Sequence, residues 1–176
     1  MNLQSIAFDQ ICVRFHHLWS QQYLLLTCGN YLASHFNTMT VGWGSLGTMW
    51  GKPFAQIVVR PHRYTFQFLE QYNSFTLCAF PEEYRPALSL LGTRSGKHTK
   101  KIAESGLTPI ASSQVDSPSF AEAELIIECK KIYWQDMDPN HFLDSSIHLK
   151  YPDHDYHRIY FGEIVAIKGR EKFIKK

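Results

Sequence analysis

Short apolar segments separated by glycine, proline and asparagine recur along this chain, and they limit its possible folds more than any other feature. Val, Ile, Phe, Tyr and Thr are frequent in these segments, as is typical of strands on a pleated sheet. We predict six strands, at residues 23–28, 36–43, 54–60, 75–80, 125–134 and 157–168. Gly162 inside the last strand predicts a bulge or a close backbone contact.

Helical segments are expected between these strands, at residues 8–19, 66–71, 82–91 and 100–104. Thr65 is expected to cap the second of them, and Gly92 to end the third. Strands and short helices do not alternate strictly, which favours an antiparallel barrel with helical insertions over a parallel sheet. Residues 109–119 are expected to form an excursion and residues 139–155 an irregular segment of one domain spanning 1–176.

Composition narrows the class of protein. The 176 residues suffice for one domain with a substantial core, and the net charge of +2 does not predict nucleic-acid binding. No apolar run reaches the roughly 20 residues of a membrane span. Charged residues interrupt the N-terminal segment, and the four cysteines contain no CxxC pair. We therefore expect a cytoplasmic protein with reduced core thiols and neither a membrane nor a nucleic-acid partner.

Two glycine motifs resemble nucleotide-binding sequences. Residues 42–47 match G-x-G-x-x-G, but Gly51 and Pro53 follow too closely for the helix that this motif requires. A glycine-rich hairpin loop is the better interpretation. Residues 92–97 resemble a P-loop that is one residue short and is followed by His98, so ATP hydrolysis is not predicted. This loop either binds an anion through its backbone or is a solvated surface loop.

Residues 153–157, Asp-His-Asp-Tyr-His, contain side chains that bind metals. In an extended chain Asp155 and His157 share one face while His154 takes the other, which disperses the ligands. We therefore predict no metal site. The chain also lacks a G-x-S-x-G nucleophile motif.

The segment 36–65 combines the features that a flat, anionic ligand needs. It begins with the polar strand residues Asn37, Thr38, Met39 and Thr40, carries Trp43 and Trp50, and ends in Arg60-Pro61-His62-Arg63. Backbone donors, aromatic faces and fixed positive charge match the ring, ribityl chain and phosphate of flavin mononucleotide (FMN).

An ordered series of motifs extends this match to most of the chain, from about Thr27 to Val165. The series comprises Asn37-Thr38-Met39-Thr40, Gly42-Trp43-Gly44, Trp50-Gly51-Lys52-Pro53, Val59-Arg60-Pro61-His62-Arg63-Tyr64-Thr65, Phe75-Thr76-Leu77, residues 91–97, Lys101-Ile102-Ala103-Glu104, Glu128-Cys129, Asp155-Tyr156-His157-Arg158 and Gly162-Glu163-Ile164. In this order the motifs resemble the flavin reductase-like proteins, which are related to flavoredoxin and have an FMN-binding split-barrel fold.

The resemblance implies a mainly β split barrel with short α insertions. It also implies a homodimer that holds FMN noncovalently at the subunit interface. Such proteins take hydride from NADH or NADPH and pass reducing equivalents to an acceptor, which this sequence does not identify. An electron carrier reduced by a protein partner, and a flavin-binding module without enzyme activity, remain alternatives.

The resemblance also implies roles for particular residues. Asn37, Thr38, Met39 and Thr40 are expected along the isoalloxazine ring, with Trp43 either covering part of the ring or lying in the dimer contact. Arg60 and Arg63 are expected to face the phosphate, although their odd separation places them on opposite faces of a regular strand. Further anion-site candidates are Thr65, Ser95, Gly96, Lys97 and Lys101. His157 and Arg158 are expected near the nicotinamide entry of the partner subunit's flavin. Alternatively, the two arginines form surface ion pairs with Glu82 or Glu83.

Overall fold

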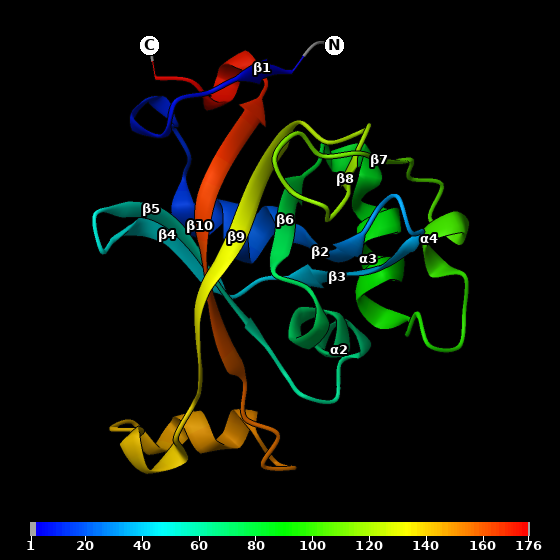
Figure 1. The fold of residues 1–176 in the computed structure, drawn as a ribbon. Helices are drawn as coiled ribbons and strands as arrows, with labels where there is room; N and C mark the ends of the chain where they lie inside the picture. The colour runs from blue at the N-terminus through cyan, green and yellow to red at the C-terminus, as the bar shows by residue number, and fades with distance from the viewer. Residues whose placement is uncertain (1–2, 176) are drawn as a thin grey trace.

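One antiparallel eight-stranded sheet organises residues 3–175, which are the residues described by the computed structural model (Figure 1). The strands follow the order β3-β2-β6-β9-β10-β5-β4, with β1 paired to β10 and a separate pair formed by β7 and β8. The strands are β1 Gln4–Ser5, β2 Leu24–Asn30, β3 His35–Val41, β4 Gly44–Met49, β5 Lys52–Val59, β6 Ser74–Ala79, β7 Pro109–Ile110, β8 Ser119–Phe120, β9 Leu125–Asp136 and β10 Arg158–Gly169.

Short helices lie between the strands. The α-helices are α1 Phe15–His17, α2 Tyr64–Gln71, α3 Arg85–Thr93 and α4 Lys101–Glu104. The π-helical turn is η2 Leu18–Gln22, and the 3-10 turns are η1 Phe8–Gln10, η3 Glu82–Tyr84, η4 Pro139–His141, η5 Ser145–Lys150 and η6 Glu171–Phe173. None of the helices formed by residues 3–175 is long and apolar enough to cross a membrane.

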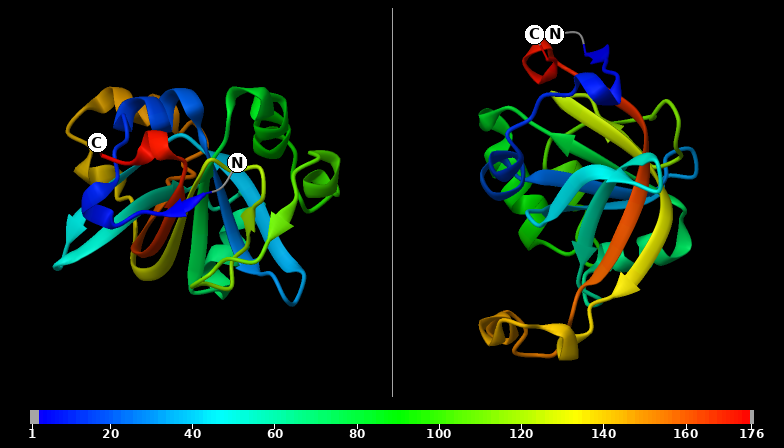
Figure 2. Two further views of the ribbon diagram at one scale, coloured as in Figure 1. Left: turned by 90° about the horizontal axis from the view of Figure 1, so that it is seen from above. Right: turned by 90° about the vertical axis from the view of Figure 1, so that its left-hand side faces the viewer.

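The two edge strands of the sheet, β3 and β4, are consecutive in the chain. Only Gly42 and Trp43 join them, so the sheet curls round until its edges meet at this connection (Figure 2). Within residues 3–175 no ladder pairs β3 with β4. The barrel is therefore split along this line.

The six predicted strands are all present, but β4 was not predicted as a strand. The glycine motif at 42–47 was interpreted as a hairpin loop, whereas Gly44–Met49 pair with β5 from Gly44 opposite Ile57 to Met49 opposite Lys52. The turn itself lies at Trp50 and Gly51, whose φ angles of 55° and 70° match a tight hairpin turn. Gly44 fits this strand because a Cβ would meet the ring of Trp19.

The helix boundaries required two corrections. Thr65 lies inside α2, and Arg63 occupies the N-cap with extended φ and ψ angles of −71° and 130°. Gly92 does not end α3, which continues to Thr93. A Cβ at Gly92 would collide with the Oγ1 of Thr40, so this glycine lets α3 approach β3 closely.

Two further segments also differ from expectation. Residues 8–19 form separate short turns instead of one helix, because Ile11 between them forms a β-bridge with Ile174. The excursion at 109–119 contains β7 and is fastened by the buried carboxylate of Glu128, which accepts backbone hydrogen bonds from Ser113 and Gln114.

Strands β9 and β10 are each 12 residues long and continue beyond the other strands. Gly162 marks a shift in their register, and its Cβ would lie 2.6 Å from the Phe75 ring, which confirms the predicted bulge and close contact. The two strands carry a segment that we call the extension, residues 137–157. It contains η4 and η5 where an irregular segment was expected, and it projects away from the sheet (Figures 1 and 2).

The cysteines occupy two environments. Cys28, Cys78 and Cys129 are buried and free, and burial raises the thiol pKa of Cys28 and Cys78 to about 12. These three are the expected core thiols. Cys12 is exposed, which corrects the expectation for that residue.

Candidate functional site

A groove runs along the split in the barrel and has two compartments. We call the first the cation compartment, a cavity of about 120 Å³. It is lined by Asn37, Met39, His62, Arg63, Tyr64, Thr65, Thr93, Arg94, Ser95 and Lys101. We call the second the aromatic compartment, which consists of two overlapping cavities of about 290 and 380 Å³. Its lining consists of Tyr23, Met39, Thr40, Val41, Gly42, Trp43, Val58, Arg60, His62, Arg63, Gly92 and His157.

Lys101 and Arg63 give the cation compartment its charge. Lys101 is only 3% exposed, and its ammonium donates to the carbonyl oxygens of Leu91 at 2.8 Å and Arg94 at 3.0 Å. Arg63 donates to the carbonyl of Gly92 at 2.6 Å. Among the residues that the structure describes, no carboxylate forms an ion pair with either cation.

The pKa values report the cost of this arrangement. Burial, and then the charge of Arg63, lowers the pKa of Lys101 to about 8. Burial, and then the charge of Arg60, lowers the pKa of Arg63. A buried and a half-buried cation that lie together without an acidic partner favour binding of an anion, which would raise both pKa values again.

The floor of the cation compartment joins β3 to the start of α2. Asn37 donates from Nδ2 to the Oγ1 of Thr65 at 2.8 Å, and both residues are buried. Because the Thr65 hydroxyl accepts this bond, its own proton is available to a ligand. Thr65 also lies in the first helical turn, where backbone N–H groups lack intrahelical partners and favour anions.

The loop that resembles a P-loop contributes only in part. Ser95 lines the cation compartment, and Gly96 lies behind it, where a Cβ would collide with the Oδ1 of Asn37. Lys97 is exposed and lines neither compartment. Arg94 lines the cation compartment while its guanidinium pairs with Glu104.

Arg60 lines the aromatic compartment, not the cation compartment. Its guanidinium donates twice to Asp155, at 2.9 and 3.0 Å, and once to the carbonyl of Lys150 at 2.7 Å. The alternative pairing with Glu82 or Glu83 is therefore wrong for Arg60, whose partner lies 95 residues away in the extension. The expectation that both arginines face the phosphate is thus corrected for Arg60: both line the aromatic compartment, but only Arg63 also lines the cation compartment.

His157 and Trp43 form one wall of the aromatic compartment. Their ring centroids are 5.1 Å apart, and Nδ1 of His157 lies 2.8 Å from the hydroxyl of Tyr151. Burial, followed by the charge of Arg60, lowers the pKa of His157 to about 4, so the imidazole is neutral at pH 7.

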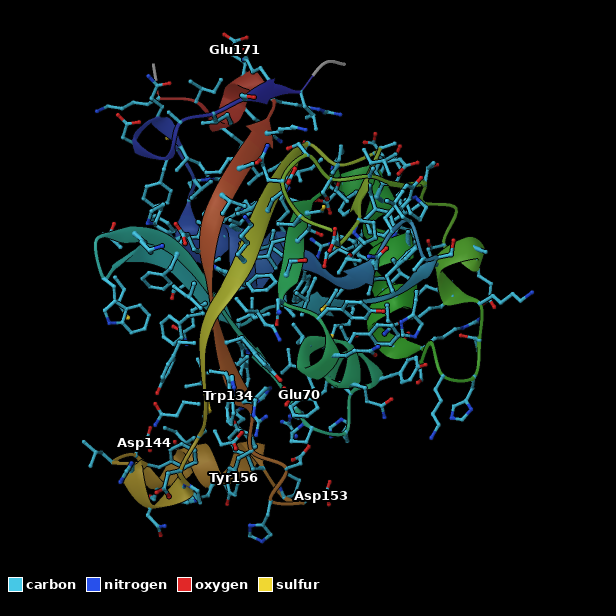
Figure 3. The ribbon with its side chains drawn as sticks, viewed as in Figure 1. Glu70, Trp134, Asp144, Asp153, Tyr156 and Glu171 are labelled. Atoms are coloured by element: carbon cyan, nitrogen blue, oxygen red, sulfur yellow. The ribbon has the colours of Figure 1, made fainter. Side chains whose placement is uncertain are left out.

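Arg158, also expected near the groove, is engaged elsewhere. It pairs with Asp136 and Glu70 at 2.7 Å and lies 3.8 Å above the ring of Trp134. Figure 3 labels Trp134 and Glu70 in the region between the sheet and the extension.

The polar stretch of β3 divides between the two faces of the strand. Met39 lines both compartments, and Thr40 lines the aromatic one. Thr38 lines neither, because its hydroxyl is buried against Thr27 at 3.0 Å and donates to the carbonyl of Leu26 at 2.8 Å. Its side chain supports β3 from within the barrel.

Several lining residues were not among the sequence candidates. They are Tyr23, Val41, Gly42, Val58, His62, Tyr64, Gly92, Thr93 and Arg94. His62 and Tyr64 could have been found, since they flank Arg63 in the predicted strand-to-helix turn. Tyr23 and Val58 carry no local signal, because only the curl of the sheet brings them to the split.

The histidine-rich segment 153–157 contributes His157 to the lining of the groove, and its Asp155 lies 2.7 Å from His62 as well as pairing with Arg60. Across residues 3–175, no group of three or more His, Cys, Asp and Glu side chains is placed to hold a metal ion.

Comparison with known proteins agrees with this geometry. The family model described as "Flavin reductase like domain" matches residues 16–175. A search of curated protein sequences found no match. Three similar solved structures are a flavoredoxin of Desulfovibrio vulgaris (Miyazaki F), an FMN-binding domain of a flavin reductase-like enzyme from Shewanella baltica OS155, and an NADH:FAD oxidoreductase of Streptomyces globisporus C-1027.

The flavoredoxin has a TM-score of 0.67 and 21% identity, with 92% of this chain and 75% of that chain covered. The Shewanella domain has a TM-score of 0.68 and 17% identity, with 96% of this chain and 77% of that chain covered. The oxidoreductase has a TM-score of 0.63 and 15% identity, with 83% of this chain and 73% of that chain covered. These likenesses confirm the predicted mainly β split-barrel fold, and the family model covers nearly the whole chain. The chain therefore belongs to the flavin reductase-like family.

Proposed function

We propose that this protein binds FMN in the groove and acts as an NAD(P)H-dependent flavin oxidoreductase. The observation that carries the proposal is a pair of cations, the buried Lys101 and the half-buried Arg63. Both line the cation compartment beside aromatic walls, and neither has a carboxylate partner within residues 3–175. The match to the flavin reductase-like family model supports the same cofactor.

The residues fit FMN compartment by compartment. Arg63, Lys101, Ser95 and the Thr65 hydroxyl supply donors for a phosphate in the cation compartment. Met39, Thr40, Trp43 and His157 line a wider space for the ring. Bound FMN supplies the capacity to accept hydride from nicotinamide and pass reducing equivalents on. The protein orients the reactants and excludes water, and this reaction requires no side chain as acid or base at the nicotinamide carbon.

Purification and anaerobic reduction test the proposal. The protein should copurify with FMN or bind it stoichiometrically, and the flavin absorbance should bleach within minutes when NADH or NADPH is added without oxygen. The nucleotide that bleaches it faster identifies the donor. If FMN binds and neither nucleotide bleaches it, the reductase activity is refuted while the cofactor assignment stands.

An electron-carrier function is the second candidate, and the structural similarity to a flavoredoxin favours it. In that case, electrons reach the flavin from a protein partner. Bleaching by a reduced ferredoxin-type donor but by neither nucleotide would select this function. If FMN does not bind, a non-redox binding role is the remaining alternative.

We also propose that the protein is a homodimer. Trp50 and Tyr133 are large apolar side chains that are 60% and 42% exposed, and they pack edge-on with ring centroids 5.8 Å apart. Exposed aromatic residues gathered on one sheet surface favour a protein contact. Sedimentation velocity should give a dimer, and Trp50→Ser combined with Tyr133→Ser should shift it toward monomer.

A further inference from the structure

Tyr151 of the extension contacts two side chains of the aromatic compartment without lining the compartment itself. Its hydroxyl lies 2.8 Å from Nδ1 of His157, and the guanidinium carbon of Arg60 lies 5.0 Å from its ring centroid. The side chain is buried, with only 3% exposure. Tyr151 can therefore influence a bound molecule only through these two neighbours.

Both partners in this contact are neutral at pH 7. Burial raises the pKa of Tyr151, so the hydroxyl keeps its proton. Burial, the charge of Arg60 and that of His62 lower the pKa of His157 to about 4, and they outweigh Asp155, which acts in the opposite direction. A neutral imidazole has one nitrogen that donates and one that accepts, and the hydrogen bond to Tyr151 decides which is which.

The surroundings of the hydroxyl favour one arrangement. Its other neighbour is the Sδ of Met137 at 3.5 Å, and a thioether is a weak acceptor compared with an imidazole nitrogen. The hydroxyl proton is therefore best placed on the line to Nδ1. Nε2 of His157 then carries the ring proton, and within residues 3–175 this nitrogen has no hydrogen-bond partner.

We propose that Tyr151 is a positioning residue that fixes His157 as the Nε2–H tautomer, so that His157 donates a hydrogen bond to a carbonyl oxygen in the aromatic compartment. This contact rests on the proposed function, because the carbonyl belongs either to the flavin ring or to the nicotinamide amide. The extension thus supports the groove from outside it, through Tyr151 and through the Asp155–Arg60 pair.

The tautomer is measured first, in the wild-type protein without cofactor. Two-dimensional ¹H–¹⁵N spectra of the imidazole at pH 7 should show the proton on Nε2 of His157, assigned by its absence in His157→Gln. In Tyr151→Phe, which keeps the ring beneath Arg60, the spectrum should move toward a mixture of tautomers. A proton on Nδ1 in the wild-type protein would overturn the inference, whether or not FMN binds.

Binding measurements then identify the acceptor. Tyr151→Phe should weaken FMN binding, or raise KM for the nicotinamide at saturating FMN, by about 2- to 10-fold, the effect of one neutral hydrogen bond. A change in FMN affinity assigns the carbonyl to the flavin, and a change in KM alone assigns it to nicotinamide. The matched control is Tyr156→Phe, which removes another hydroxyl from the extension. Among residues 3–175 that hydroxyl bonds only to the exposed His154, at 3.1 Å, so the FMN affinity and the nicotinamide KM should both stay unchanged.

A second pair of variants separates the hydrogen bond from the shape of the site. His157→Gln retains an N–H donor near the position of Nε2 and should keep most of the affinity that His157→Leu loses. The proposed hydrogen bond from His157 would be refuted if His157→Gln and His157→Leu bound FMN and nicotinamide equally well. It would also be refuted if Tyr151→Phe changed neither the FMN affinity nor the nicotinamide KM. If wild-type protein fails to bind FMN, the proposed function and the contact fall together, and the spectrum still decides the role of Tyr151.

Discussion

Arg60 and Arg63 lie three residues apart, yet the structure treats their charges in opposite ways. Arg60 has its charge balanced by Asp155 before any ligand binds. Arg63 shares its compartment with the buried Lys101, and among residues 3–175 neither has an acidic partner. A balanced cation organises protein structure, whereas an unbalanced pair is built for an anionic ligand. Substitutions and changes of pH should therefore affect the cation compartment and the aromatic compartment differently.

The largest difference is expected in FMN affinity. Arg63→Ala or Lys101→Ala should weaken FMN binding by about 10- to 150-fold, the effect of losing one charge-assisted contact of about 1.5–3 kcal/mol. Fluorescence titration of FMN measures this directly. Lys97→Ala is the matched control, because Lys97 is exposed and lies outside both compartments. A greater loss of FMN affinity in Arg60→Ala than in Arg63→Ala would place the phosphate in the aromatic compartment instead of the cation compartment.

The pH dependence of binding sharpens the comparison. Without ligand, Lys101 titrates with a pKa of about 8, so above this pH phosphate binding must be accompanied by proton uptake. The Kd for FMN should therefore rise by up to about tenfold per pH unit above pH 8. In Lys101→Met this dependence should disappear. A Kd that stays constant from pH 7 to 9.5 in the wild-type protein would contradict a role for Lys101 in holding the phosphate.

In the aromatic compartment, His157 should lower the free energy of unfolding at acid pH. The folded-state pKa of His157 is about 4, below the unfolded value of 6.5, so between these values the unfolded chain binds more protons. The contribution is fully present above pH 6.5 and is lost as the pH falls toward 4, with a slope of at most about 1.4 kcal/mol per pH unit. Urea unfolding at several pH values should show a shallower acid loss for His157→Gln. If the free energy of unfolding falls equally with pH in the wild-type protein and in His157→Gln, His157 is not the source of the acid loss.

The smallest effect on binding is expected from Asp155→Asn. Removing this charge weakens the support of Arg60 and should lower the free energy of unfolding by about 1 kcal/mol, since both side chains are only partly buried. FMN affinity should change by less than about threefold, because the proposed phosphate site is the cation compartment, which Arg60 does not line. An affinity loss as large as that of Arg63→Ala would show that the two compartments do not act separately.

The sequence predicted the parts of this site that depend on local pattern. The six strands follow from apolar runs bounded by turn residues, and the turn from Arg60 to Thr65 follows from Pro61 at the strand end. The sequence did not distinguish Thr38, which lines neither compartment, from Asn37, Met39 and Thr40, which line at least one.

The remaining features depend on tertiary contacts that leave no local trace. Asp155 reaches Arg60 only because β9 and β10 carry the extension past the barrel. Strand β4 was missed because glycine is unfavourable in strands, while Gly44 is required there by the ring of Trp19. The pairing of Tyr151 with His157 likewise depends on the fold of the extension.

The separation of Cys12 from the three core thiols makes this chain convenient for spectroscopy. A maleimide dye should react with one sulfur in the native protein, because the other three are buried and two of them have a pKa near 12. Cys12 donates its backbone N–H to Phe173, so the dye would sit where the first and last turns of the chain meet. Energy transfer between such a dye and flavin fluorescence would measure the distance from this junction to the groove without any engineered cysteine.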